Sequence, residues 1–221
     1  MSSSINFKNI LVVGVGLIGG SIIIFSIGLS KKILIADSLS IYADILFNGV
    51  QSNLVPELFL SWLGSLAYTF QLYFDFSGYS DMAIGLALLF GIWLPINFNS
   101  PFKAINIIDF WQRWHMTLTR YINMYLYTPI TLRFARIGIN YSETTGLLFS
   151  LVLPTMIIFL ILGFWHGASW NYIIFGAMHG FFVVSNHLYR KLFSSTSKKN
   201  IFLYIYIGNK AKGEHSQEHI K

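Results

Sequence analysis

One histidine, His166, lies in a short stretch rich in aromatic residues and glycine, between two apolar segments. Each segment is long enough to enter a bilayer, and an ionisable side chain at that depth is costly unless it serves a site. Histidine titrates near neutral pH, so it is suited to moving a proton during a reaction. Trp165 and Trp170 predict an aromatic wall, and Gly163 and Gly167 would let backbone approach a ligand. The alternative is an interfacial histidine in an aromatic belt.

A second cluster, residues 71–81, places two carboxylates among aromatic and hydroxyl side chains at the end of an apolar run. Asp81 is predicted to be the N-cap of a helix over 82–94, because a carboxylate there accepts hydrogen bonds from the unpaired amides of the first turn. Capping is also the alternative for Asp75, which we keep as a candidate for orienting a binding site.

A third cluster, Asp109–His115, combines charged and aromatic side chains. Residues four apart are neighbours on a helix, so Asp109 is expected to pair with Arg113 and Trp111 to lie on the same face as His115. An ion pair and an aromatic belt explain most of this pattern. A second histidine near the membrane, His115, remains as a candidate site residue, with Trp111 beside it.

Three further polar residues follow His166 toward the end of the last apolar segment. Asn171 is a candidate substrate contact at the start of that segment. His179 precedes a glycine inside it, and we expect a packed core histidine bonded to a carbonyl in preference to a catalytic group. His187 lies close to a basic pair and is predicted to be interfacial.

The composition indicates an integral membrane protein. Of 221 residues, 54% are hydrophobic and only 11% are charged, and the mean hydropathy is +0.58. Soluble domains carry about 25% charged residues. The net charge of +6 is concentrated between apolar runs, as the positive-inside rule expects, so it does not indicate nucleic-acid binding. The absence of cysteine excludes disulfides and thiolate chemistry within this chain.

The apolar pattern predicts an all-α, polytopic membrane protein with about five apolar membrane helices plus amphipathic or re-entrant helices. The predicted spans are 10–29, 58–74, 82–94, 147–162 and 171–188. Residues 32–48 are expected to form an interfacial helix, and 101–136 a surface-lying or re-entrant amphipathic helix.

Charge placement and composition complete the predicted organisation. Lys31, Arg133 and Arg190 are expected on the cytoplasmic side, with the His166 turn toward the opposite face. Residues 1–199 are predicted to form a membrane-embedded core, and 200–221 a polar tail. His215 and His219 in that tail have the spacing of helical metal ligands, but a disordered tail is the favoured interpretation.

Several of these motifs together resemble the membrane-bound O-acyltransferase (MBOAT) family. They are Gln71–Asp81, Leu94–Asn99, Phe110–His115, and Gly163–His166 followed by His179-Gly180. The similarity runs from about Gly28 to Leu188, and its nearest branch is that of the bacterial alginate O-acetylases (AlgI-like). Members of the family are about twice as long, so the resemblance predicts a partial or truncated copy whose isolated product is unstable or inactive by itself.

The resemblance implies a multi-helix enzyme that moves an acyl group, most often acetyl, onto hydroxyls of an exported polysaccharide. The family's catalytic histidine matches His166, which would act as general base, and its second important histidine matches His115. Asp75, Trp165, Trp111 and Asn171 would contact substrate. Backbone amides around residues 163–169 would stabilise the oxyanion.

The resemblance also implies partners and a location. An activated donor such as acetyl-CoA would serve as co-substrate, with no tightly bound cofactor and no metal. Membrane lipid, a polysaccharide acceptor and periplasmic acetylation or export proteins would be the partners, without nucleic acid, in the bacterial inner membrane.

Two other function classes remain open from the residues. Several histidines at membrane depth, including His166 and His179, could ligate haem, although His115 lies in a charged segment that suits this poorly. A transporter or a non-catalytic truncated remnant is the other alternative. The visible absorption spectrum of purified protein separates haem binding from acyl transfer.

Overall fold

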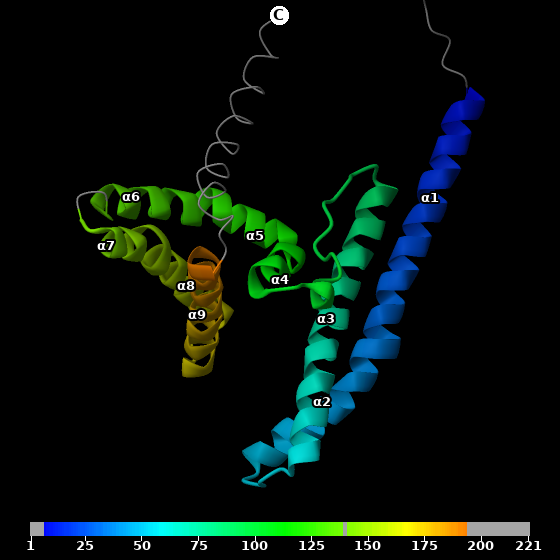
Figure 1. The fold of residues 1–221 in the computed structure, drawn as a ribbon. Coiled ribbons are helices and arrows are strands. Elements are labelled where there is room, and N and C mark those ends of the chain that lie inside the picture. The colour runs from blue at the N-terminus through cyan, green and yellow to red at the C-terminus, as the bar shows by residue number, and fades with distance from the viewer. Residues whose placement is uncertain (1–6, 139–140, 194–221) are drawn as a thin grey trace, which may run out of the picture. The chain divides into compact units, whose positions relative to one another are not determined.

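A computed structural model describes residues 7–138 and 141–193, and all regular structure in these residues is helical (Figure 1). The predicted all-α class is confirmed. The described chain divides into two compact units. The first runs to Asn99 and takes in Trp114–Thr117, and the second takes in Ser100–Arg113 and continues from Leu118. The predicted polar tail, with His215 and His219, lies outside the described residues.

The first unit consists of two long helical stretches that pack side by side (Figure 1). The first stretch continues without a break, because the residues flanking its π-helical segment keep right-handed helical backbone. Its elements are α1 (Phe7–Ser30), the π-helical segment Lys31–Ala36 and α2 (Asp37–Gln51), and the returning stretch is α3 (Leu58–Leu89). The predicted span over 10–29 and the predicted helix over 32–48 are therefore both helical.

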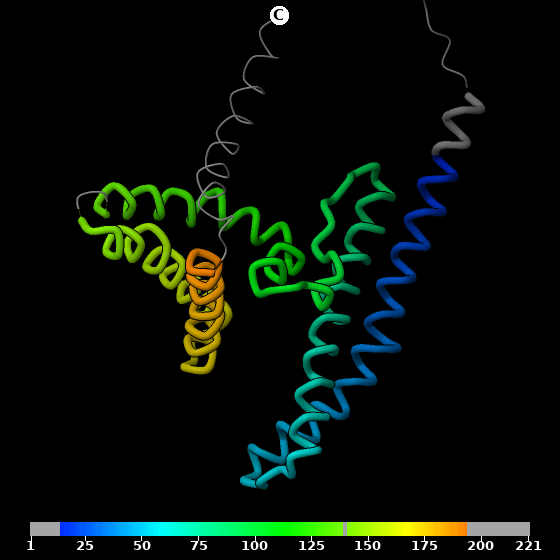
Figure 2. Tube along the Cα trace, in the orientation of Figure 1, coloured from blue at the N-terminus to red at the C-terminus, as the bar shows by residue number. Residues whose placement is uncertain are grey.

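Helix α3 corrects the predicted pair of apolar runs. Residues 58–89 form one helix of 32 residues, about 48 Å long at 1.5 Å per residue. The tube in Figure 2 shows no turn between its two ends. The predicted break at residues 75–81 is wrong, and so is the N-cap role of Asp81, which lies inside the helix.

Two glycines of α3 serve helix packing, which explains why they do not break the helix. A Cβ atom on Gly78 would lie 2.6 Å from the carbonyl oxygen of Gly28 on α1, and one on Gly85 would lie 2.8 Å from the carbonyl oxygen of Ser21. The two backbones are thus too close for any larger residue. Small residues at such crossings are typical of helix pairs in membranes.

Two lysines and three aspartates form ion pairs next to this crossing. Lys31 Nζ lies 2.6 Å from Asp81 Oδ2. Lys32 Nζ lies 2.6 Å from Asp75 Oδ1 and 2.8 Å from Asp37 Oδ1. Both aspartates of α3 therefore have a structural partner on the neighbouring stretch.

The unequal pairing of the two lysines gives a stability prediction. Asp81→Asn leaves Lys31 without its carboxylate, whereas Asp75→Asn leaves Lys32 paired with Asp37. Losing a hydrogen bond to a charged group costs about 2 kcal/mol, which corresponds to about 4–8 °C for a chain of this size. Thermal unfolding in detergent should show a lower midpoint for Asp81→Asn than for Asp75→Asn. Equal midpoints would contradict the pairing.

Because residues 58–89 form a single helix, the predicted placement of Lys31, Arg133 and Arg190 on one side of the membrane no longer follows from the order of the spans. That topology counted 58–74 and 82–94 as two crossings, which placed Arg133 and Arg190 on the same side as Lys31. One helix over 58–89 changes the number of crossings by one. Within the described residues, two stretches are long and apolar enough to cross a bilayer, Gly14–Gln51 and Glu143–His166.

The second unit begins with short helices and ends with a helical hairpin. Its early part does not form the predicted amphipathic helix over 101–136, because the helical structure is interrupted at residues 114–115. From Pro101 on, the elements are the 3₁₀ turn Pro101–Lys103, α4 (Ile107–Arg113), α5 (Met116–Ile122), the π-helical segment Asn123–Tyr127, α6 (Thr128–Gly138), α7 (Glu143–Leu147), the π-helical segment Leu148–Val152, α8 (Leu153–His166) and α9 (Trp170–Phe193).

Helices α8 and α9 pack closely through facing glycines. A Cβ atom on Gly163 would overlap the carbonyl oxygen of Tyr172 and lie 3.2 Å from the Cα of Gly176. A Cβ atom on Gly176 would overlap the carbonyl oxygen of Phe159. The predicted segments 147–162 and 171–188 are both helical, and this glycine contact holds them as an antiparallel pair joined at His166.

Candidate active site

His166 is the last residue of α8, where the chain turns toward α9. Its side chain is exposed, and three aromatic rings lie near it. Ring centroids lie 5.1 Å away at Trp165, 5.8 Å at Phe175 and 6.4 Å at Tyr172, the last in a stacked arrangement. Of the predicted aromatic wall, Trp165 lies beside His166, and Tyr172 and Phe175 of α9 add to it. No ring contact joins Trp170 to His166 in the described part of the chain.

The backbone of the turn after His166 is largely occupied by its own hydrogen bonds. Gly167 N donates to Phe164 O at 3.2 Å, and Ser169 N donates to Gly167 O at 2.9 Å. These two amides are engaged, so the expected oxyanion donors in residues 163–169 do not include them in this arrangement. Asn171, the candidate substrate contact, is exposed on the first turn of α9, and its backbone N donates to Ser169 Oγ at 3.4 Å.

A series of ring contacts leads from His166 to α4. Phe175 lies 4.5 Å from His179, and His179 lies 5.1 Å from Trp111, between ring centroids. Phe159 of α8 contacts both His179 and Trp111. Trp111, predicted as a substrate contact, is therefore connected to His166 through aromatic packing within one unit.

Two nitrogen atoms in this series are buried without a hydrogen-bond partner among the described residues. They are Nε1 of Trp111 and Nδ1 of His179. The predicted packing of His179 is present, because three aromatic rings surround it. The predicted bond to a carbonyl is not seen at Nδ1.

His115, the second candidate histidine, belongs to the first unit. It follows the end of α4 and has a left-handed backbone, with φ of 42°. Its ring meets that of Phe76 on α3 edge to face, with centroids 4.7 Å apart. The predicted shared helix face of Trp111 and His115 is wrong, because α4 ends at Arg113 and the two residues lie in different units.

The predicted ion pair of the same cluster is confirmed. Arg113 Nε lies 2.8 Å from Asp109 Oδ1 across one turn of α4. This hydrogen bond, with a second from the backbone of Ile105, holds the pKa of Asp109 below its ordinary value. Asn106 Oδ1 accepts from the amides of Ile108 and Asp109 and so caps the start of α4.

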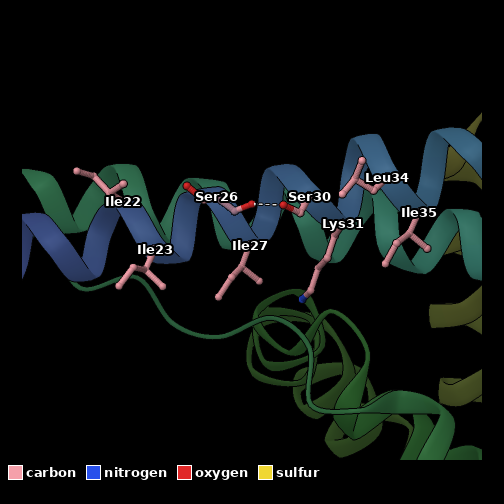
Figure 3. Close-up of a pocket in the computed structure, with 8 residues that line it drawn as sticks. All are labelled: Ile22, Ile23, Ser26, Ile27, Ser30, Lys31, Leu34 and Ile35. Carbon is pink, nitrogen blue, oxygen red and sulfur yellow. Dashed lines mark hydrogen bonds between the residues drawn. The ribbon is translucent and has the colours of Figure 1, made fainter.

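Asp75 lies on α3 and is paired with Lys32, as described above. A hollow of about 460 Å³ opens on the neighbouring helix surface (Figure 3). It contains none of the candidate site residues. Its lining consists of Ile22, Ile23, Ser26, Ile27, Ser30, Lys31, Leu34 and Ile35.

Asn97, within the motif Leu94–Asn99, fastens the His115 turn, a role that the sequence did not indicate. Asn97 accepts hydrogen bonds from both Met116 and Thr117, which directly follow His115. The signal in the sequence was an asparagine in a mostly apolar stretch after α3, but nothing local indicated a partner 20 residues away. Tyr172 and Phe175 were missed because their contact with His166 depends on the hairpin.

Comparison with known proteins gives the same family along nearly the whole chain. The family model of MBOAT, the membrane-bound O-acyltransferase family, matches residues 16–212. The chain is 48% identical over 176 residues to the peptidoglycan O-acetyltransferase of Helicobacter pylori, which covers 80% of this chain and 29% of the relative.

Two other groups of relatives carry related names. A probable alginate O-acetylase AlgI of Azotobacter vinelandii is 44% identical over 156 residues, covering 71% of this chain and 28% of the relative. A teichoic acid D-alanyltransferase of Bacillus subtilis is 30% identical over 165 residues, covering 75% of this chain and 40% of the relative. The chain spans less than a third of the length of the two O-acetyltransferases. The motifs, the helical fold and the match to the family model together show that this chain belongs to the membrane-bound O-acyltransferase family.

Proposed function

We propose that the chain takes part in O-acyl transfer, moving an acetyl group from an activated donor to hydroxyls of an exported polysaccharide. The observation that carries this proposal is the position of His166 at the turn of the glycine-packed α8–α9 hairpin. Its imidazole is exposed and has aromatic rings around it, so it can reach an incoming hydroxyl. The acetyl group is proposed because the relatives with 44% and 48% identity are named as acetylases.

In the proposed reaction, His166 acts as general base on the acceptor. The imidazole takes the hydroxyl proton while the oxygen attacks the carbonyl carbon of a thioester such as acetyl-CoA. The new C–O bond forms, the C–S bond breaks, and the protonated imidazole returns its proton to the leaving thiolate. Histidine suits both steps because its ordinary pKa lies near neutral pH.

The other candidate residues are proposed to assist His166. Trp165 stands beside His166, and Asn171 lies just past the turn, where both can contact an acceptor sugar. Trp111 is reached through the ring series, and its unpaired Nε1 is a donor for a substrate oxygen. His115 lies in the first unit and is proposed as a second catalytic residue, and Asp75 of the same unit is proposed to contact substrate.

We further propose a multi-pass location in the bacterial inner membrane. Large apolar side chains exposed on several helices support contact with lipid, for example Ile23 at 62% on α1 and Phe181 at 61% on α9. A polysaccharide acceptor and periplasmic acetylation or export proteins are the proposed partners.

The proposed activity is tested in the cells that encode the chain. Deleting the gene should lower the acetate that mild alkali releases from the exported polysaccharides, and a plasmid copy should restore it. Unchanged ester-linked acetate after deletion would contradict the proposal. Loss of ester-linked D-alanine with unchanged acetate would keep acyl transfer but show that the acyl group is wrong.

A further inference from the structure

The backbone at His115 is held in a conformation that residues other than glycine seldom adopt. Its φ of 42° lies in the left-handed region, which is unfavourable for a residue with a side chain because the Cβ atom crowds the following carbonyl oxygen. Such a conformation persists only where the surrounding structure fixes it. Groups outside the turn must therefore hold His115 in this conformation.

Asn97 holds the residues that follow His115 through hydrogen bonds. Its backbone oxygen accepts from Met116 N at 2.9 Å, and its side-chain Oδ1 accepts from Thr117 Oγ1 at 2.5 Å and from Thr117 N at 3.4 Å. Met116 and Thr117 are the two residues after His115 and the first two of α5. One asparagine thus satisfies the first amides of α5 and determines where that helix begins.

The same asparagine is also bonded to α3. Asn97 Nδ2 donates to Ser80 Oγ at 3.4 Å, one helical turn after Phe76, whose ring contacts His115. The next residue, Phe98, packs edge to face against Phe76 and Trp114, with centroids 5.1 Å away in both cases. The asparagine therefore joins the α3 surface under the imidazole to the turn that carries it.

We infer that Asn97 and Thr117 are positioning residues for His115. Through its hydrogen bonds to Met116 and Thr117, Asn97 clamps the two residues after the histidine. This clamp holds the backbone of His115 left-handed and its ring against Phe76. This inference rests on the proposed function, in which His115 serves the reaction. A shift of about 1 Å in a catalytic group can lower a rate by about a hundredfold, so a loosened clamp should affect turnover more than substrate binding.

Three substitutions test the clamp. Thr117→Val keeps the shape of the side chain but removes the hydroxyl donor, and Thr117→Ser keeps the donor. Thr128→Val is the matched control, because Thr128 Oγ1 also donates to a backbone oxygen, that of Asn123 at 2.7 Å, but outside the clamp. We expect kcat to fall about ten- to hundredfold in Thr117→Val with KM nearly unchanged, and to stay near wild type in the other two.

A second readout does not depend on the reaction. The rate at which diethyl pyrocarbonate modifies His115, followed by mass spectrometry in native membranes, reports the surroundings of the imidazole. We expect this rate to change severalfold in Thr117→Val and to be unchanged in Thr117→Ser and Thr128→Val. A changed rate without acyl transfer by the wild-type protein would uphold the clamp and refute the proposed function. An unchanged rate in Thr117→Val, or equal effects of Thr117→Val and Thr128→Val, would overturn the inference.

Discussion

Gly163→Leu is expected to remove the folded protein from the membrane almost completely. Any Cβ at this position overlaps the carbonyl oxygen of Tyr172, and a leucine must also displace Gly176 of α9. Both are backbone contacts, so a rotamer change cannot relieve them. Overpacking in a close-packed core costs about 1–3 kcal/mol when side chains can move, and more when backbone must separate.

The measurement is the amount of monodisperse protein extracted in mild detergent from equal amounts of membrane. Gly146→Ala is the matched control in the same unit, because a Cβ there would lie 3.4 Å from Gly138 O, an ordinary contact. It should be extracted like the wild type. Normal recovery of Gly163→Leu would contradict the close packing of α8 and α9.

His166→Ala is expected to lower acyl transfer by about 10²–10⁴-fold, the usual contribution of a general base. The protein should remain folded, because the side chain is exposed at the end of α8 and its loss creates no cavity. Ester-linked acetate on exported polysaccharides, measured in cells that carry the chromosomal substitution, reports the activity, and extraction in detergent reports the fold.

His187→Gln is the control for this substitution, since it also removes a histidine but lies on α9 away from the turn. It should leave the acetate content unchanged. Wild-type acetate in His166→Ala cells would show that another group is the base. Equal loss in both variants would indicate a general effect on the helical hairpin.

The sequence indicated the helical class correctly because apolar runs of this length leave few alternatives in lipid. The prediction was wrong at residues 75–81, where carboxylates, serines and a glycine resembled a turn but the chain is helical. The structure pairs both carboxylates with lysines and packs Gly78 against Gly28. Those partners are about 50 residues away, so no local pattern contains them.

The candidate site likewise has some features that local spacing predicts and others that it does not. The turn at His166 and the Asp109–Arg113 pair follow from local spacing and were predictable. The end of α4 before His115 was not, because it depends on Asn97 binding the next two residues from another segment. Helical spacing alone therefore grouped Trp111 with His115, whereas the structure places its ring against His179.

Transfer of labelled acetyl by native membranes is the direct test of His166 as the general base. Membrane vesicles from cells that encode the chain would receive acetyl-CoA carrying a ¹³C-acetyl group, and the exported polysaccharide would be analysed for ester-linked label by mass spectrometry. We expect labelled O-acetyl groups with wild-type vesicles and their near-complete loss with His166→Ala vesicles that contain the same amount of protein. Equal labelling by the two preparations would contradict the assignment of His166 as the base.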